Sequence, residues 1–234
     1  MKRLWLYVVF LASGFAALLY QVVWQRSLYA IYGINIESVT MVVTAFMLGL
    51  GLGSLAGGAL SKDPKRPVLL MFAGVEAGIG LFGFFSLDVF RVVGQVTLGL
   101  SPAATGAVTF VLVLVPTLLM GGTLPLLVGY LVRESKNVGK SVATLYFVNT
   151  LGSAFASAAA VMWFLGHRGQ IGTARVASLL NFTVAAIAYL QYRRSLAEPR
   201  PAAAVAGSEP AADSGPVADS EPAADAKATR EVPS

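Results

Sequence analysis

The feature that most constrains the fold is a series of long apolar segments separated by short basic clusters. Six segments are each long enough to cross a bilayer, which takes about 20 apolar residues in a helix: 5–25, 38–60, 67–89, 105–131, 140–166 and 171–192. Only 12% of the residues are charged, against about a quarter in soluble domains. We therefore predict an all-α, polytopic membrane bundle of about six transmembrane helices, occupying residues 1–194.

The basic residues indicate how the bundle is oriented. One end is expected to carry most of them: Lys2, Arg3, Lys62, Lys65, Arg66, Arg133, Lys136, Lys140, Arg193 and Arg194. The other end is expected to carry only Arg26, Arg91, Arg168 and Arg175. Because positive charge marks cytoplasmic loops, both termini are predicted to be cytoplasmic, in a bacterial inner membrane. Residues 91–102 are expected to lie along the membrane interface.

Composition argues against several classes of function. The chain has no cysteine and one histidine, His167, so thiolate chemistry is excluded and a histidine-built metal site or triad is disfavoured. No catalytic residue, metal or cofactor is therefore expected. The formal net charge of +5 is explained by the basic clusters between apolar runs, so it does not indicate a nucleic-acid partner.

The composition changes after Arg194, where alanine, proline and acidic residues dominate. The hexapeptide SEPAAD occurs twice, at 208–213 and 220–225. A segment of this kind buries too little apolar surface to offset its chain entropy, so residues 195–234 are predicted to be a disordered cytoplasmic tail. It is interpreted as a dispensable extension, with a docking tether as the alternative.

Glu76 is the most informative single residue. It lies in the middle third of an apolar segment, where a carboxylate costs several kcal/mol (on the order of 3) unless it is paired, protonated or hydrated. Such acids serve as proton relays, cation ligands or members of buried ion pairs. The alternative is an acid that only fixes the packing of the bundle.

Small residues recur at helical spacing in two segments. Gly49, Gly53 and Gly57 form a small-xxx-small ladder, and Gly152 lies in a related pattern in segment 140–166. A face of this kind lets another helix backbone approach closely. The two segments occupy corresponding positions in a three-plus-three arrangement, which indicates an internal repeat of the transporter type. Ordinary helix packing is the alternative.

Segment 105–131 contains residues that interrupt helix hydrogen bonding. They are Pro116, Met120, Gly121, Gly122 and Pro125. Each proline removes a backbone hydrogen bond and clashes with the preceding turn. The segment is interpreted either as a hinge that lines a solute path or as a rigid kink.

Polar side chains also crowd the end of segment 5–25, in the run YQVVWQR (20–26). Trp24 and Arg26 suit a membrane boundary. Gln21 and Gln25 lie one helical turn apart, so they are predicted to form a polar seam facing the interior of the bundle. Elsewhere, Asn149 can bond across helices, and Asn181 is assigned to interhelical packing.

Four stretches follow one another in a distinctive order: SGFAALLYQVVWQRSLYAIYG (13–33), VEAGIG (75–80), PTLLMGGTLPLL (116–127) and GKSVATLYFVNTLGSAF (139–155). Together they resemble the membrane portion of the fused integral-membrane spermidine synthase-like proteins. Those proteins join a half of major-facilitator character to a cytoplasmic aminopropyltransferase-type domain. The resemblance covers most of residues 5–190 and implies a half-major-facilitator-like bundle in a polyamine-related setting. It draws attention to Tyr20, Gln21, Trp24, Gln25, Arg26, Glu76, Pro116, Met120, Gly121, Pro125, Tyr146 and Asn149.

The sequence departs from that family where a synthase domain would follow, because the Ala/Pro tail takes its place. We therefore expect a separately encoded aminopropyltransferase-like partner, a stand-alone membrane module, or a lineage without the enzyme. A homodimer is a further expectation, since a six-helix half would need a second copy or a partner to enclose a path.

Two functions are consistent with these features. The first is a membrane module that binds or transports a small cationic solute, plausibly a polyamine. Glu76 is the expected counter-ion. Cation–π contact is expected from Tyr20, Trp24 and Tyr146, and hydrogen bonds from the amides of Gln21, Gln25 and Asn149. The second is a non-transporting anchor that docks a cytoplasmic enzyme through the loops at 61–66 and 133–140.

Overall fold

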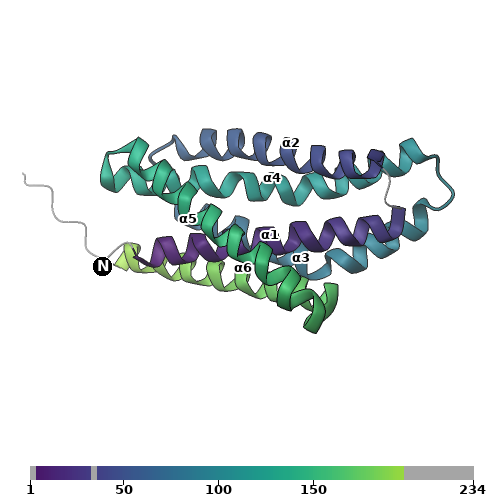
Figure 1. Cartoon of the computed structure of the whole chain (residues 1–234). Coiled ribbons are helices and arrows are strands. Elements are labelled where there is room, and N and C mark those ends of the chain that lie inside the picture. The colour runs from purple at the N-terminus through teal and green to yellow at the C-terminus, as the bar shows by residue number, and fades with distance from the viewer. Residues whose placement is uncertain (1–3, 33–35, 198–234) are drawn as a thin grey trace, which may run out of the picture. The chain divides into compact units, whose positions relative to one another are not determined.

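The computed structural model describes residues 4–32 and 36–197, and it places them in helices joined by short connections (Figure 1). The elements are α1 (Leu4–Tyr32), α2 (Ile36–Ser61), α3 (Val68–Thr97), α4 (Pro102–Ser135), α5 (Val138–Ala159), a π-helical turn η1 (Ala160–Phe164) and α6 (Leu165–Ala197). No strand occurs in these two ranges, so the all-α class is confirmed. The predicted tail lies outside the described residues, apart from 195–197, which end α6.

Five helical stretches are long and apolar enough to cross a membrane: Leu4–Ala30, Thr40–Ser61, Val68–Thr97, Ala103–Arg133 and Val138–Ala197. The last one contains both of the predicted segments 140–166 and 171–192. It is interrupted at Gly169, which has φ 63° and ψ −173°. Of residues 91–102, which are predicted to lie along the interface, 91–97 continue α3 to Thr97, and their position at the interface stays a prediction.

The helices of the bundle pack in defined pairs. α2 lies along α4, while α5 and α6 both pack against α1. α3 connects the two groups, since it packs against α6 on one side and α4 on the other. Figure 1 shows α2 beside α4 over much of their length, and α5 crossing obliquely over α1.

Glycine brings α2 and α4 into backbone contact. A Cβ atom at Gly53 would overlap the carbonyl oxygen of Leu118, and one at Gly57 would lie 2.7 Å from the carbonyl oxygen of Gly122. A Cβ at Gly49 would overlap the side chain of Thr117. The ladder read from the sequence therefore packs inside the bundle, against α4.

The α1–α5 pair uses the same device. A Cβ at Gly152 would overlap the carbonyl oxygen of Leu11, and a Cβ at Gly14 would overlap that of Asn149. Close approach of two backbones gains van der Waals contact without a hydrophobic driving force, which lipid does not supply. Small residues thus fix the position of α5, and with it the side chain of Asn149.

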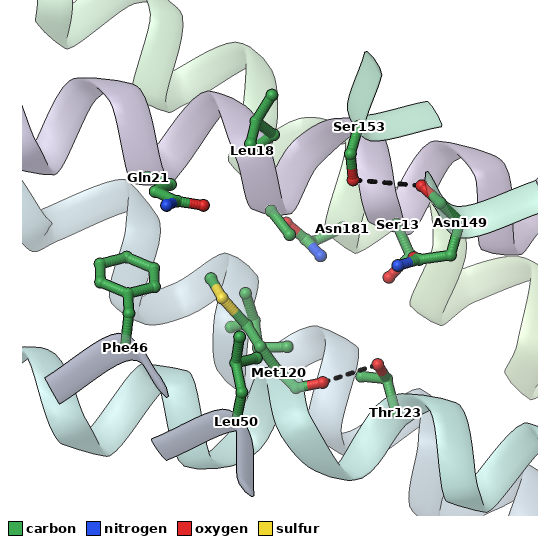
Figure 2. A pocket seen from close by; sticks show the side chains of 12 residues that line it. Ser13, Leu18, Gln21, Phe46, Leu50, Met120, Thr123, Asn149, Ser153 and Asn181 are labelled. Atoms are coloured by element: carbon green, nitrogen blue, oxygen red, sulfur yellow. Dashed lines mark hydrogen bonds between the residues drawn. The ribbon is translucent and has the colours of Figure 1, made fainter. Parts of the chain in front are cut away.

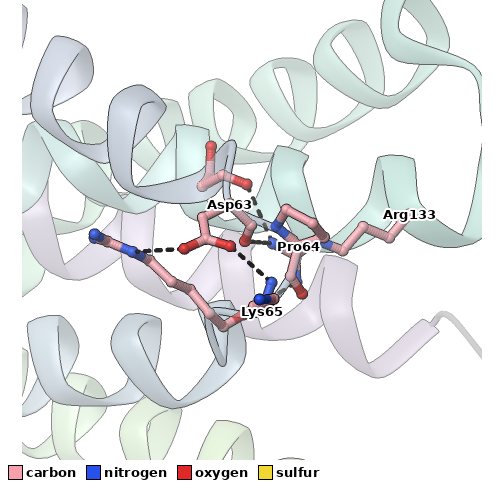
Figure 3. Close-up of polar contacts among 6 residues, drawn as sticks. Asp63, Pro64, Lys65 and Arg133 are labelled. Carbon is pink, nitrogen blue, oxygen red and sulfur yellow. Dashed lines mark hydrogen bonds and ion pairs between the residues drawn. The ribbon is translucent and has the colours of Figure 1, made fainter.

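One end of the bundle carries the loop 62–67 and the turn 136–137, and we call it the basic-loop end (Figure 3). Here the guanidinium of Arg133, on the last turn of α4, donates hydrogen bonds to the backbone carbonyls of the α2–α3 connection. The acceptors are Asp63 at 2.7 Å, Arg66 at 3.0 Å, Ser61 at 3.2 Å and Pro64 at 3.3 Å. One side chain therefore ties the end of α4 to the whole connection.

The turn into α5 is closed by local capping. Lys136 ends α4 with φ 54°, in the left-handed region, and Oδ1 of Asn137 accepts from the backbone N–H of Lys140 at 3.0 Å. A capping side chain of this kind satisfies a backbone donor that the first helical turn leaves free. This compact turn fixes where α5 begins.

The core consists of two apolar clusters with a polar layer between them. One cluster surrounds Trp24, and the other surrounds Phe10 towards the basic-loop end. The boundary falls at a polar residue on each of four helices: Ser13, Glu76, Thr123 and Asn181. Four buried polar residues from four helices therefore lie at one level of the bundle.

Candidate functional site

Glu76 joins three helices at the centre of the polar layer. Its side chain is fully buried on α3. The hydroxyl of Ser13 on α1 donates to Oε1 at 2.6 Å, and Nδ2 of Asn181 on α6 donates to Oε2 at 2.6 Å. Within the described ranges Glu76 forms no ion pair, and the pairs present are exposed ones, Arg66–Asp63 and Arg91–Asp88. The carboxyl group is thus hydrogen-bonded on both oxygens without a cation beside it.

The depth of this group follows from helix geometry. Ser13 lies nine residues after the start of α1, and Glu76 lies eight residues after the start of α3. At 1.5 Å per residue these positions are about 12–14 Å along their helices. A hydrocarbon core is about 30 Å thick, so helices that cross it from these starts would place the group near its middle.

A cavity of about 150 Å³ lies beside this group, and residues from all six α-helices line it (Figure 2). The lining consists of Ser13, Ala17, Leu18, Gln21, Phe46, Leu50, Ile79, Met120, Thr123, Asn149, Ser153 and Asn181. Both hydrogen-bond partners of Glu76 therefore line the cavity, while Glu76 itself does not line it and is connected to it through these two bonds.

The polar groups of the lining differ in what they can still bind. The hydroxyl of Thr123 donates to the carbonyl oxygen of Met120 at 2.8 Å, and that of Ser153 donates to Gly14 at 3.0 Å, so both protons are used. Oδ1 of Asn181 is buried without a partner. An unsatisfied buried acceptor costs about 1–3 kcal/mol, so the cavity favours an occupant that donates hydrogen bonds.

The structure separates the predicted aromatic residues from the cavity. Tyr20 and Trp24 are fully buried and stacked on one another, with ring centroids 4.9 Å apart. Nε1 of Trp24 donates to Ser86 at 2.9 Å. The expectation that Trp24 belongs to a boundary belt is wrong, because Gly83 and Ser86 on α3 make room for both rings inside the core.

Two further predicted residues lie elsewhere. Nε2 of Gln25 donates to the hydroxyl of Tyr29 at 2.6 Å, and Gln25 does not line the cavity. Tyr146 is 61% exposed on the outside of α5, although Asn149, three residues later, reaches the cavity. Of the predicted binding set, Gln21 and Asn149 line the cavity, and Glu76 lies behind two of its lining residues.

The predicted hinge residues occupy different surroundings. α4 continues through both Pro116 and Pro125. Met120 lines the cavity, whereas Gly121 and Gly122 face the backbone of α2. The helix is thus unbroken at the prolines, and its role as a hinge stays a prediction.

Several lining residues were not found from the sequence. The sequence alone indicates no role for Ser13, Thr123 and Ser153. It predicts a packing role for Asn181, which in the structure both bonds Glu76 and faces the cavity. A signal was present for two of them. Ser13 precedes Gln21 by eight residues on one helical face, and Ser153 follows Asn149 by four.

The fold and the cavity define a helical module with membrane-spanning capacity and a polar centre. Comparison adds one relative: the chain is 24% identical over 197 residues to a polyamine aminopropyltransferase from Oceanobacillus iheyensis, covering 81% of this chain and 36% of that protein. The chain therefore spans about a third of the length of this curated relative. No protein-family model and no solved structure matches the chain. The similarity is weak, and it is compatible with a polyamine-associated membrane module.

Proposed function

We propose that this bundle is a membrane module that binds or transports a small cationic solute, with polyamines as the solute class. The observation that carries the proposal is the position of Glu76. It is a fully buried carboxyl group without an ion pair, and both of its hydrogen-bond donors, Ser13 and Asn181, line a central cavity. The relative's name, a polyamine aminopropyltransferase, supports the choice of solute.

Electrostatics favours a cation in the cavity. A carboxylate inside a bilayer costs on the order of 3 kcal/mol or more without compensation. The amide of Asn181 would then bridge the two charges: its Nδ2 bonds Glu76, and its Oδ1 would accept from the ammonium group. In a medium of low dielectric constant, opposite charges at this separation attract strongly. When Glu76 is ionised, a neutral occupant would leave its charge uncompensated.

The lining favours an ammonium group that carries N–H bonds. The amides of Gln21, Asn149 and Asn181 face the cavity and offer carbonyl acceptors. A quaternary ammonium has no proton to donate and is usually held by an aromatic cage. Here Phe46 is the aromatic ring in the lining, so hydrogen bonding has to supply the recognition.

The dimensions favour a slender solute. At about 150 Å³ the cavity is smaller than the roughly 300–1,000 Å³ of pockets for drug-sized ligands. Leu18, Leu50 and Ile79 provide an apolar surface for methylene groups between the amides. An unbranched alkylamine, or one end of a longer polyamine, suits this combination.

We infer six membrane crossings. The stretch Val138–Ala197 would be about 90 Å long as one straight helix, three times the thickness of the hydrocarbon core. The interruption at Gly169 divides it, and α5 and α6 both pack against α1, which supports two crossings. By the positive-inside rule, the basic-loop end would be cytoplasmic, in an inner membrane.

The helix pairing supports a half-major-facilitator-like repeat. In such a repeat, α1 corresponds to α4, α2 to α5 and α3 to α6, and the main helix contacts of one half have counterparts in the other. α2 packs on α4 as α5 packs on α1, and α3 packs on α4 as α6 packs on α1. Transporters built from such repeats hold their solute at the interface between them, near the bilayer midplane. All three helices of each proposed repeat contribute residues to the cavity, which supports this arrangement.

A non-transporting anchor is the second candidate, and the Arg133 contacts favour it. They order the α2–α3 connection and leave Lys65 and Arg66 exposed at the basic-loop end, where an enzyme could dock. The partner would be a separate aminopropyltransferase-like protein, and the bundle could act as a homodimer. Glu76 would then serve packing alone.

Equilibrium binding of labelled spermidine to the purified protein separates the two functions. Glu76→Gln removes the charge with little change of shape, and Asp88→Asn makes the same exchange at an exposed position three turns further along α3. We expect at least a tenfold loss of affinity, about 1.4 kcal/mol, in the first variant and none in the second. Equal affinities in both variants and the parent would reject the cation site and favour the anchor.

A further inference from the structure

A second pocket of about 470 Å³ lies at the end of the bundle opposite the basic-loop end, apart from the central cavity. Its lining comes from three helices: Ser27 and Ala30 of α1, Leu87 and Arg91 of α3, and residues 168–171 of α6. Ser27 and Arg91 each lie 23 residues after the start of their helix, about 35 Å along it. This distance exceeds a hydrocarbon thickness of about 30 Å, so the pocket lies at the level of the membrane interface.

The pocket gathers positive charge. Arg91 and Arg168, from α3 and α6, both line it, and the lining residues whose side chains the structure describes include no carboxylate. Arg91 has an acidic neighbour in Asp88, whose Oδ1 lies 3.7 Å from the guanidinium, with both side chains 62% exposed. An exposed pair of this kind is worth about 1 kcal/mol or less, so Arg91 stays available to another anion.

Local structure positions the second arginine. The guanidinium of Arg168 lies 5.9 Å from the centre of the Trp163 ring, and Trp163 belongs to the π-helical turn η1. The next residue, Gly169, has φ 63°, so the helix is interrupted where the pocket lies. Trp163 also stacks on the ring of His167. These contacts place the guanidinium of Arg168 beside the ring of Trp163.

The donor set indicates the chemistry of the ligand. A guanidinium offers paired N–H groups that match the oxygens of phosphate, and it is chosen where bidentate recognition of this group is needed. The hydroxyl of Ser27 and the amide of Gln170 supply further donors in the same lining. Two guanidinium groups match the one to two negative charges of a phosphate ester.

We propose that this pocket binds a phosphate group at the membrane interface. The group could belong to an anionic lipid or to a small soluble phosphate, and both present the same oxygens to Arg91 and Arg168. The site is independent of the central cavity, so it stands whether or not the bundle binds cations.

The test measures binding to the purified full-length chain in detergent. The probes are phosphatidylglycerol, with phosphatidylcholine as the reference lipid, and inorganic phosphate. The variants are Arg91→Gln, Arg168→Gln and their combination. The matched control is Arg175→Gln, because that guanidinium lies 5.5 Å from the ring of Phe84 and outside the lining. Arg91→Lys, which keeps the charge without the paired donors, replaces any glutamine variant that does not fold.

We expect each glutamine variant to lose about tenfold in affinity for the bound probe and the control to lose none. Phosphatidylglycerol binding that inorganic phosphate does not displace would identify a lipid headgroup. Binding of inorganic phosphate that competes with the lipid would identify a soluble phosphate. Binding of neither probe above the reference, or an equal loss in Arg175→Gln, would overturn the proposal.

Discussion

Asn181 on α6 donates a hydrogen bond from Nδ2 to Oε2 of Glu76 on α3 at 2.6 Å, across 105 positions of sequence. Its other amide atom, Oδ1, is buried without a partner, and the residue lines the central cavity. One amide therefore connects the buried carboxyl group to the space where a solute would bind. Under the proposed function, this relationship would make Asn181 a binding residue as well as a packing residue.

Asn181→Ala should therefore reduce both stability and spermidine affinity. The matched control is Ser178→Ala, three residues earlier on α6, whose hydroxyl donates to the carbonyl oxygen of Gly80 at 2.7 Å outside the cavity. Each variant loses a buried hydrogen bond and should be destabilised by about 1–3 kcal/mol. Thermal unfolding in detergent and labelled-spermidine binding should show a tenfold loss of affinity in Asn181→Ala alone. Similar affinities in the two variants would assign Asn181 to packing.

Gly53→Ala should destabilise the bundle, because its Cβ would overlap the backbone of Leu118. Overpacking of a closely packed site costs about 1–3 kcal/mol. Gly51→Ala is the matched control, two residues away on α2, where a Cβ meets nothing within 4 Å. Alanine is the better helix former, so the control should be neutral or slightly more stable. Equal unfolding temperatures of the two variants would contradict the α2–α4 packing.

Ser86→Ala should leave Nε1 of Trp24 buried without an acceptor, since the two atoms of this bond are 2.9 Å apart. The expected loss is about 1–3 kcal/mol in the free energy of unfolding. Trp24→Phe removes the donor of this bond. In a Trp24→Phe background, Ser86→Ala should therefore lower the free energy of unfolding clearly less than it does in the parent protein. A double-mutant cycle read by thermal unfolding measures this coupling. Additive effects would show that the bond does not form.

Arg133→Gln should loosen the α2–α3 connection, because Arg133 donates to four of its carbonyl groups. Hydrogen exchange of a peptide covering 61–68 should become faster, while exchange in the helices stays unchanged. Arg193→Gln is the control, since the hydroxyl that Arg193 contacts belongs to Tyr189 on its own helix. Unchanged exchange in Arg133→Gln would show that the loop is ordered without the guanidinium.

The helical class could be predicted because it depends on local sequence. Apolar length alone identified the helices, and the depth of Glu76 followed from its place within an apolar run. The extension of α3 through 91–97 could not be found in this way, since its mixed composition suits an interface as well as a helix end. The division of Val138–Ala197 depends on the backbone of one glycine, Gly169.

The candidate site was harder to predict, because distant residues decide it. Tyr20 and Trp24 have the composition of a boundary belt, yet Gly83 and Ser86, more than 60 residues away, give them room in the core. Ser13 looks like any small residue until Glu76 is placed beside it. Pairings between helices therefore determine which polar groups meet, and spacing along one helix does not reveal them.

The most direct measurement of the central claim is solute protection of a cysteine in the cavity. The chain has no cysteine, so Ser153→Cys places a single thiol in the lining with little change of size. Its rate of reaction with a small thiol reagent would be followed with and without spermidine, in the parent and in Glu76→Gln. Ser195→Cys, exposed at the end of α6, is the control for the reagent. Spermidine should slow the reaction of Ser153→Cys only when Glu76 is present. Equal rates with and without spermidine, or equal protection in Glu76→Gln, would contradict a cation site governed by Glu76.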